Sequence, residues 1–124
     1  MRKVIVSAST EYAVLIGRGL LAQLGTEVAK RICPCKAAVI TDTTVEKLYA
    51  EQAEQSLAAA GVPTCRFSYP AGEGSKHIGT LSDMLEFLAE QEITRQDIII
   101  ALGGGVAGDM AGFAAAVYQR GIRF

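Results

Sequence analysis

Tryptophan is absent from this chain, and histidine occurs once, at His77. A catalytic metal site with several imidazole ligands therefore cannot be built from these residues. Cysteine is also scarce, because Cys33, Cys35 and Cys65 make an odd count that does not suit a disulfide framework. The "CPC" segment has one residue between its thiols, where zinc knuckles have about two to four. We expect free thiols in a cytoplasmic protein.

Long apolar runs and an excess of charge of one sign are missing as well. Half of the residues are hydrophobic, but no stretch of about 18 apolar residues lacks charges, so no membrane span is expected. The N-terminal "MRKVIVSAST" holds too short an apolar stretch for a secretory signal. The net charge is −1, and no basic patch points to nucleic acid as a partner. A chain of 124 residues can form one domain with a core of its own.

The first part of the chain predicts a β-hairpin followed by a helix. Residues 3–17 hold two β-branched runs with a Ser/Thr/Glu break between them. Residues 18–32 predict a helix, which Pro34 ends. Its apolar stripe consists of Leu21, Leu24, Val28 and Ile32.

Strands and helices alternate in the rest of the chain. Residues 36–41 predict a strand, and the T-x-x-E spacing of Thr43 and Glu46 predicts a capping box where the next helix starts. Gly61 ends this helix, whose expected buried face consists of Val45, Leu48, Ala53 and Leu57. The strand "VPTCRFSYP" and the loop "AGEGSK" then precede a helix with an apolar stripe of Ile78, Leu81, Leu85 and Leu88.

The most apolar predicted strand is "DIIIAL", and the turn "GGG" follows it. A helix of small residues, "VAGDMAGFAAAVYQ", comes next, and "GIRF" is the start of one more strand. This alternation predicts an α/β fold, in which the N-terminal β-hairpin is followed by a Rossmann-like doubly wound, mostly parallel sheet. Such sheets bind ligands at the carboxyl ends of their strands. We therefore expect the loops after residues 41, 69 and 102 to lie along one edge.

The glycine-rich turn is the first candidate site. Gly103, Gly105 and Gly108 match the G-x-G-x-x-G pattern, whose backbone amides approach a phosphate at a helix N-terminus. The match alone is weak evidence. A P-loop requires Lys and Ser or Thr where this chain has Asp109 and Met110, and a carboxylate there would repel a triphosphate.

Each charged residue near these loops has an ordinary structural interpretation beside a functional one. Asp109 is either an acidic residue in the first turn of a helix, favoured by the helix dipole, or a hydrogen-bond acceptor for a bound cofactor. Glu73 and Lys76 either form an incidental pair in a solvated turn or contact ribose hydroxyls and a phosphate. Asp42 either caps a helix or contacts an adenosine ribose, and His77 is interpreted as a surface residue at a helix start.

The motifs in this order resemble those of the 3-dehydroquinate synthase family. "GGGVAGDMAGFAAAVYQRGIRF" is similar to the family pattern GGGVxGDxxGFxAxxYxRGIxF at every specified position. "PAGEGSK" resembles the family segment PxGExxK, and "TDTTV" resembles its TD-x-x-V segment. The resemblance covers the whole chain, and it includes the N-terminal hairpin.

The resemblance implies an NAD-using cyclase that converts 3-deoxy-D-arabino-heptulosonate 7-phosphate into 3-dehydroquinate and phosphate. A divalent metal, zinc or cobalt, would polarise the sugar phosphate substrate, and NAD would carry the redox chemistry. Residues 1–124 would form the N-terminal NAD-binding α/β domain, cut off at the start of a strand. The family's metal ligands and its C-terminal helical domain would lie in later segments. The fragment alone would then be catalytically inactive.

Position by position, the resemblance implies cofactor contacts in two loops and at one aspartate. Glu73 and Lys76 would lie at the adenosine ribose end, the glycine turn would approach the diphosphate, and Asp109 would hold the nicotinamide end. Arg120 matches a family arginine that reaches the substrate; otherwise it is a cation favoured at a helix C-terminus. The full set of implied cofactor contacts is Asp42, Ala71, Gly72, Glu73, Gly74, Ser75, Lys76, Gly104, Gly105, Val106, Ala107, Gly108 and Asp109.

Several functions remain open on the sequence. Glycerol and iron-containing alcohol dehydrogenases carry GGGSxxDxxK, but this chain has Val106 and Gly112 where that pattern has its serine and lysine. The motifs are also compatible with a sibling sugar-phosphate cyclase and with a stand-alone nucleotide-binding module. The sequence leaves the oligomeric state open, and a homodimer is one candidate.

Overall fold

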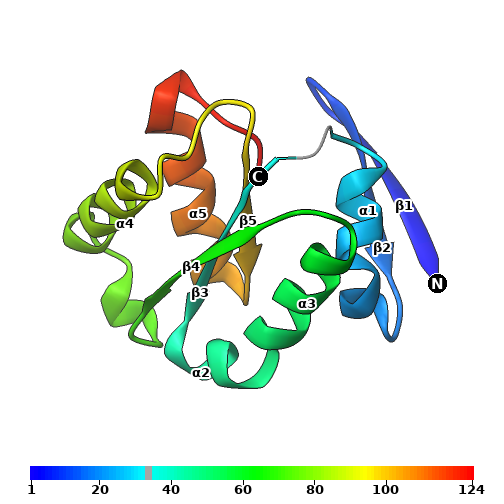
Figure 1. Cartoon of the computed structure of the whole chain (residues 1–124), viewed down its shortest axis with the longest axis horizontal. Coiled ribbons are helices and arrows are strands. Elements are labelled where there is room, and N and C mark those ends of the chain that lie inside the picture. The colour runs from blue at the N-terminus through cyan, green and yellow to red at the C-terminus, as the bar shows by residue number, and fades with distance from the viewer. Residues whose placement is uncertain (33–34) are drawn as a thin grey trace.

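The computed structural model describes residues 1–32 and 35–124, and their strands form two separate sheets (Figure 1). The expectations for Cys33 and Pro34 fall outside the described residues. The N-terminal hairpin pairs β1 (Arg2–Ser7) with β2 (Glu11–Ile16) in antiparallel register, as expected. Among the described helices, none combines the length and the hydropathy needed to cross a membrane.

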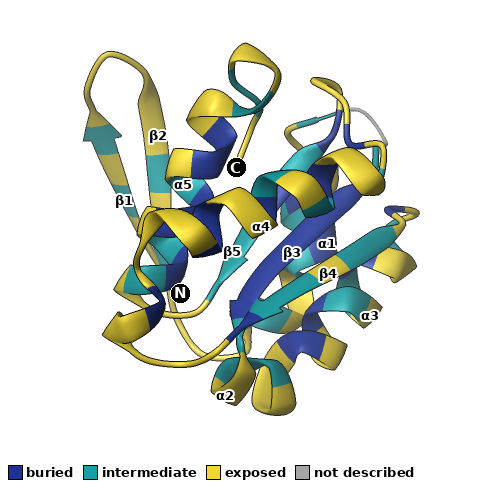
Figure 2. Ribbon diagram, turned by 90° about the vertical axis from the view of Figure 1, so that its left-hand side faces the viewer, coloured by how far each residue is buried: buried dark blue, intermediate teal, exposed yellow. Residues whose placement is uncertain are grey.

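The second sheet is parallel and has the order β4-β3-β5. The strand β3 (Ala37–Asp42) lies between β4 (Thr64–Tyr69) and β5 (Ile98–Leu102). Helices cover both faces of a doubly wound sheet, so its central strand is buried on both sides and consists mostly of apolar residues. Residues 37–41 are accordingly buried, and β3 forms the dark centre of Figure 2.

Helices pack on both faces of this sheet, which confirms the doubly wound arrangement. On one face, Ala38 and Ile40 contact the core formed with α4 (Ile78–Glu90) and α5 (Gly105–Val117). On the other face, Ala37 and Val39 pack with Val28 of α1 (Leu24–Ala29) and Leu57 of α3 (Glu51–Ala59). Figure 1 shows α4 and α5 on one side of the sheet and α1, α3 and the hairpin on the other.

The helix expected over residues 18–32 is shorter than predicted. A 3-10 turn over Leu20–Gln23 precedes α1, which ends at Ala29. Gly19 precedes this turn in the left-handed conformation, with a φ of 71°. Apolar spacing alone predicted too long a helix, because it did not show that the left-handed Gly19 delays the start and that the first turn is 3-10 instead of α.

The helix after β3 starts at residue 43 as predicted, but the capping residue is Asp42 rather than Thr43. Asp42 Oδ1 accepts hydrogen bonds from the amides of Thr44 at 2.9 Å and Val45 at 2.8 Å. Glu46 does not close a capping box, because its carboxylate pairs with Arg66 at 3.2 Å. The element runs from α2 (Thr43–Val45) through a π-helical turn (Glu46–Ala50) into α3.

Two residues expected in buried helical stripes are exposed. Leu48 is 64% exposed, because the five-residue step to Ala53 turns about 140° around a helix; Ala50 is buried instead. Ile78 is 78% exposed as the first residue of α4, and Met84 joins Leu81 and Leu88 in the core.

The two expectations for the ends of elements are met. Gly61 ends α3 with a φ of +81°, and Val62 donates its amide to the carbonyl of Leu57 at 2.9 Å. The segment 121–124 runs beside β5 through a single parallel bridge between Ile98 and Arg123. This bridge agrees with the start of a further strand.

Candidate cofactor site

Three loops meet at the carboxyl edge of the parallel sheet, as the sequence predicts. Asp42 is opposite Tyr69 in the register, and Thr41 is opposite Leu102, so β3, β4 and β5 end at the same edge. The amide of Ala71 donates to Thr43 Oγ1 at 3.2 Å, which joins the loop after β4 to the start of α2. A second contact, between Lys76 and Asp109, joins the same loop to α5.

The glycine turn connects β5 to α5 at this edge. Gly103 has a φ of +149°, a conformation that L side chains rarely adopt, so this glycine is required by the backbone. No side chain caps the N-terminus of α5, and the first amides of a helix have no acceptor within it. These amides and the helix dipole form an arrangement suited to an anion.

Gly104, Gly105 and Gly108 differ from Gly103 in a way that matters for function. None of them has a positive φ, and an added Cβ at any of the three would meet no atom within 4 Å. Neither the backbone nor the packing of this chain therefore requires glycine at these positions. The space beside these three glycines is open, and side chains at these positions would occupy it.

The loop over residues 70–76 is closed by its own hydrogen bonds. Gly72 has a φ of +108°, and its carbonyl accepts from the amide of Ser75 at 3.2 Å. The Ser75 hydroxyl donates to the carbonyl of Pro70, and Ser75 is buried. Ser75 therefore shapes the loop with its side chain and does not present it at the edge, whereas Glu73 and Gly74 are exposed.

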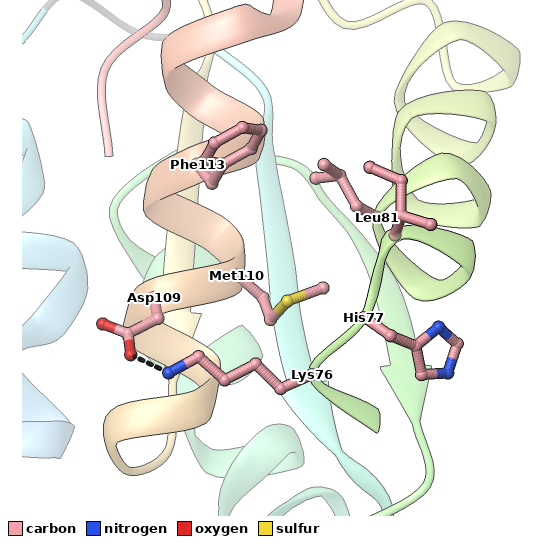
Figure 3. Close-up of a pocket in the computed structure, with 7 residues that line it drawn as sticks. Lys76, His77, Leu81, Asp109, Met110 and Phe113 are labelled. Atoms are coloured by element: carbon pink, nitrogen blue, oxygen red, sulfur yellow. Dashed lines mark hydrogen bonds and ion pairs between the residues drawn. The ribbon is translucent and has the colours of Figure 1, made fainter. Parts of the chain in front are cut away.

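Lys76 and Asp109 form an ion pair across the edge (Figure 3). Lys76 Nζ lies 2.7 Å from Asp109 Oδ2, although the two residues are 33 positions apart in the sequence. The hydrogen bond to Asp109 raises the pKa of Lys76. Asp109 is the fifth residue of α5 and lies outside its first turn, so the helix-dipole interpretation of this carboxylate is wrong.

A pocket of about 320 Å³ lies between α4 and α5 beside this pair. Its walls are mostly apolar and are formed by Ile78, Leu81, Met110 and Phe113. In Figure 3 the stem of Lys76 extends from the α4 side towards Asp109, past Met110. The sequence did not predict this pocket, because Phe113 and Ile78 were assigned no role outside helix packing.

Two polar residues of the candidate site act as helix caps. Asp42 caps α2, which is the structural interpretation of this residue. His77 Nδ1 accepts a hydrogen bond from the amide of Gly79 at 3.1 Å and caps α4 at the surface, as predicted. Neither function prevents the remaining atoms of these side chains from contacting a ligand.

The remaining predicted residues divide into those at the edge and those away from it. Ala107 is 1% exposed with its methyl group in the core, so it can offer only its amide, and Val106 packs half-buried against the same core. Arg120 lies beyond the far end of α5, with a φ of 64°. Because α5 has 13 residues, Arg120 is about 20 Å from the glycine turn and is not brought together with the other predicted residues.

Tyr69 was not predicted to take part in the site. It is 2% exposed at the carboxyl end of β4, and its hydroxyl has no hydrogen-bond partner among the described residues. Burial raises the pKa of Tyr69, and the nearby Asp42 carboxylate reinforces this effect. Nothing in the "SYP" segment distinguished this tyrosine from an ordinary strand residue.

The described part of the chain offers no candidate metal centre. No group of three or more His, Cys, Asp and Glu side chains within residues 1–32 and 35–124 is arranged to hold a metal ion. The polar groups that the described residues place at the edge are backbone amides that can bind an anion, the Lys76 cation and exposed carboxylates.

Comparison with known proteins gives one consistent result for the sequence. Residues 66–124 match the family described as 3-dehydroquinate synthase N-terminal. The chain is 48% identical over 124 residues to the 3-dehydroquinate synthase of Streptococcus suis, covering 100% of this chain and 35% of that protein. It is 50% identical over 113 residues to the enzyme of Bradyrhizobium diazoefficiens, covering 91% and 30% respectively. The chain thus spans about a third of the length of these relatives.

Solved structures share the fold. A 2-deoxy-scyllo-inosose synthase complexed with carbaglucose-6-phosphate, NAD⁺ and Co²⁺ superposes with a TM-score of 0.86 at 22% identity, covering 98% of this chain and 33% of that one. The 2-epi-5-epi-valiolone synthase of Streptomyces hygroscopicus, with NAD⁺ and Zn²⁺ bound, gives a TM-score of 0.76 at 28% identity, covering 96% and 32%. A Red Sea brine pool alcohol dehydrogenase gives 0.68 at 26%, covering 95% and 27%.

Proposed function

We propose that this chain, which is homologous to the N-terminal region of 3-dehydroquinate synthases, binds NAD across the glycine turn at the carboxyl edge of its sheet. In this proposal it supplies the cofactor-binding part of an enzyme that converts 3-deoxy-D-arabino-heptulosonate 7-phosphate into 3-dehydroquinate and phosphate. Relatives at 45–50% identity include the 3-dehydroquinate synthases of Streptococcus suis, Bradyrhizobium diazoefficiens, Cereibacter sphaeroides and Enterococcus faecalis.

One observation carries the cofactor proposal. Gly104, Gly105 and Gly108 lack side chains where neither packing nor backbone conformation demands it. A ligand that comes close to the main chain explains all three glycines, because a Cβ at any of them would reduce that approach. The uncapped N-terminus of α5 supplies amides for its diphosphate.

The neighbouring loop supports a nucleotide at the same place. Glu73 is exposed on the loop after β4 and can accept hydrogen bonds from ribose hydroxyls, while Gly74 leaves open space beside it. Lys76 provides the positive charge for a phosphate. NAD, when bound, supplies hydride transfer, and this chain's own residues bind and orient it.

The sequence relatives favour this assignment over a sibling sugar-phosphate cyclase and over an alcohol dehydrogenase. Two structural neighbours are a valiolone synthase with NAD⁺ and Zn²⁺ bound and an alcohol dehydrogenase, but their identities of 28% and 26% are far below that of the synthases. The chain spans about a third of those synthases, and its described residues offer no metal-ligand group. We therefore expect the purified chain to form no 3-dehydroquinate by itself.

Titration of the purified chain with NAD tests the cofactor proposal. We expect a saturable binding signal in calorimetry or NMR and an increase in melting temperature, because a ligand that binds only the folded state stabilises it. Nicotinamide mononucleotide serves as a control that lacks the adenosine half. The absence of heat, of chemical shift changes and of a thermal shift at millimolar NAD would overturn the proposal and leave a folding unit without nucleotide affinity.

A further inference from the structure

The ion pair between Lys76 and Asp109 occupies the charged groups that a bound dinucleotide would need. Lys76 is the single lysine or arginine in the loop after β4 (residues 70–77) and in the glycine turn with the start of α5 (residues 103–109). Lys76 Nζ is 2.7 Å from Asp109 Oδ2, and no other ion pair involves either side chain among the described residues. In this state the cation of the edge is neutralised by a carboxylate of the same chain.

This contact conflicts with a simple division of the site. The family resemblance implies that Lys76 lies at the adenosine end of the cofactor and Asp109 at its nicotinamide end. While Lys76 Nζ and Asp109 Oδ2 lie 2.7 Å apart, each of the two charges is paired with the other. The pair must therefore open for both residues to make their separate contacts.

We infer that the pair is a latch, in which Lys76 exchanges the Asp109 carboxylate for the diphosphate of the incoming cofactor. The released carboxylate then accepts a hydrogen bond from a hydroxyl or amide of the nicotinamide half of that cofactor. This inference rests on the proposed function. Lys76 moves from an internal anion to a ligand anion, and Oδ2 of Asp109 loses its partner in that step. The adenosine half thus opens the contact that the nicotinamide half uses.

The exposure of the pair makes the exchange inexpensive. The side chains of Lys76 and Asp109 are 44% and 62% exposed, and ion pairs of this kind are worth little in water. Lys76 also has a long stem, which can swing without moving the backbone of the loop. Opening the pair should therefore weaken ligand binding by about two- to fivefold relative to a site with a free lysine.

ADP is the probe, because it carries the diphosphate and the adenosine but lacks the nicotinamide. We expect Asp109→Asn to tighten ADP binding by about two- to fivefold, since Lys76 no longer has an internal partner. Lys76→Met should weaken ADP by roughly tenfold or more, through loss of a charge-assisted contact. Lys47→Met is the matched control, because Lys47 is exposed outside these two loops, and it should leave the ADP affinity unchanged.

The double variant separates the latch from simple repulsion between Asp109 and the diphosphate. With Lys76→Met in place, a latch leaves Asp109→Asn with no further effect on ADP binding, whereas repulsion tightens it equally in both backgrounds. NMR titrations measure all four dissociation constants into the millimolar range. Equal tightening in both backgrounds, or none in the single variant, overturns the latch while nucleotide binding by the chain stands. Failure of the unmodified chain to bind ADP or NAD overturns the proposed function and the latch with it.

Discussion

Gly25 of α1 packs directly against the backbone of Ser56 in α3. Its amide donates to Ser56 Oγ at 2.9 Å, and that hydroxyl donates to the carbonyl of Ala22 at 2.9 Å. A Cβ at Gly25 would lie 2.0 Å from the carbonyl oxygen of Ser56, a distance that no relaxation of a side chain can relieve. The two helices on this face of the sheet approach so closely because this position has no side chain.

Gly25→Ala should therefore separate α1 from α3. We expect it to lower the free energy of unfolding by about 1–3 kcal/mol or more, the range of overpacked cores. Urea denaturation monitored by circular dichroism measures the change. Gly74→Ala is the matched control, because an added Cβ there meets nothing within 4 Å, and its stability should stay within about 0.5 kcal/mol. Equal stabilities of the two variants would contradict the close helix approach.

Gly108→Ala should have opposite effects on stability and on binding. Gly108 lies within α5 at an open position, so alanine should raise the free energy of unfolding by about 0.5–1 kcal/mol. The same methyl group occupies the space proposed for the cofactor, and we expect NAD affinity to fall by about tenfold or more. Thermal denaturation and NAD titration of one preparation measure both quantities. A variant that is more stable and binds NAD as well as the unmodified chain would remove the functional explanation for this glycine.

The sequence predicted the layers of the fold and the edge at which the loops meet. Alternating apolar strands and amphipathic helices are sufficient for this, because parallel strands joined by helices all end at one edge. The hairpin, the central strand β3 and the C-terminal stop at Gly61 followed from local patterns of the same kind. Local rules work where the physical cause lies within a few residues of the effect.

The errors have two kinds of cause, one local and one distant. Leu48 is hydrophobic, but its position around the helix axis places it on the exposed face. The predicted capping box at Thr43 does not form, because the neighbouring Asp42 caps the helix. The pairing of Lys76 with Asp109 joins two loops separated by 33 positions, and no spacing rule addresses such a pair. The sequence identified both residues as candidates without indicating that they touch.

Asp97 should make the stability of the chain depend on pH in the acid range. The carboxylate is buried and accepts hydrogen bonds from the amides of Lys36 at 2.9 Å and Thr94 at 2.7 Å. Burial by itself would raise the pKa of Asp97, but these hydrogen bonds outweigh it and hold the pKa below its ordinary value of 3.8. The folded state therefore binds this proton less readily than the unfolded state, and its stabilising contribution is complete only above that ordinary value.

We expect this contribution to be lost as the pH falls from about 4 through the lower pKa of the folded state. Asp97→Asn should reduce the stability at pH 7 by about 1–3 kcal/mol, and it should remove part of the acid dependence. Urea midpoints between pH 7 and pH 3 measure both effects. Asp83→Asn, at an exposed position of α4, is the control and should follow the curve of the unmodified chain. An Asp97→Asn curve parallel to that of the unmodified chain would contradict the assignment.

Two Tyr→Phe substitutions should change stability in opposite directions. Tyr118 donates its hydroxyl to the carbonyl of Ile93 at 2.7 Å and lies 3.2 Å from that of Leu88, so Tyr118→Phe should cost about 1–2 kcal/mol. The Tyr69 hydroxyl is buried without a partner among the described residues, and its removal should stabilise the fold by about 1 kcal/mol. Denaturation of both variants in the same buffer gives the comparison.

A gain in stability for Tyr69→Phe would mean that the hydroxyl does not stabilise the fold. Tyr69 lies at the edge of the sheet that we propose binds the cofactor. Removal of an orphaned buried polar group is favourable unless something else uses it. If the hydroxyl orders water or loop atoms under a bound dinucleotide, the stabilised variant should bind NAD several-fold more weakly. Unchanged NAD affinity would assign Tyr69 to the core alone. A loss of stability would mean instead that an internal water already satisfies the hydroxyl.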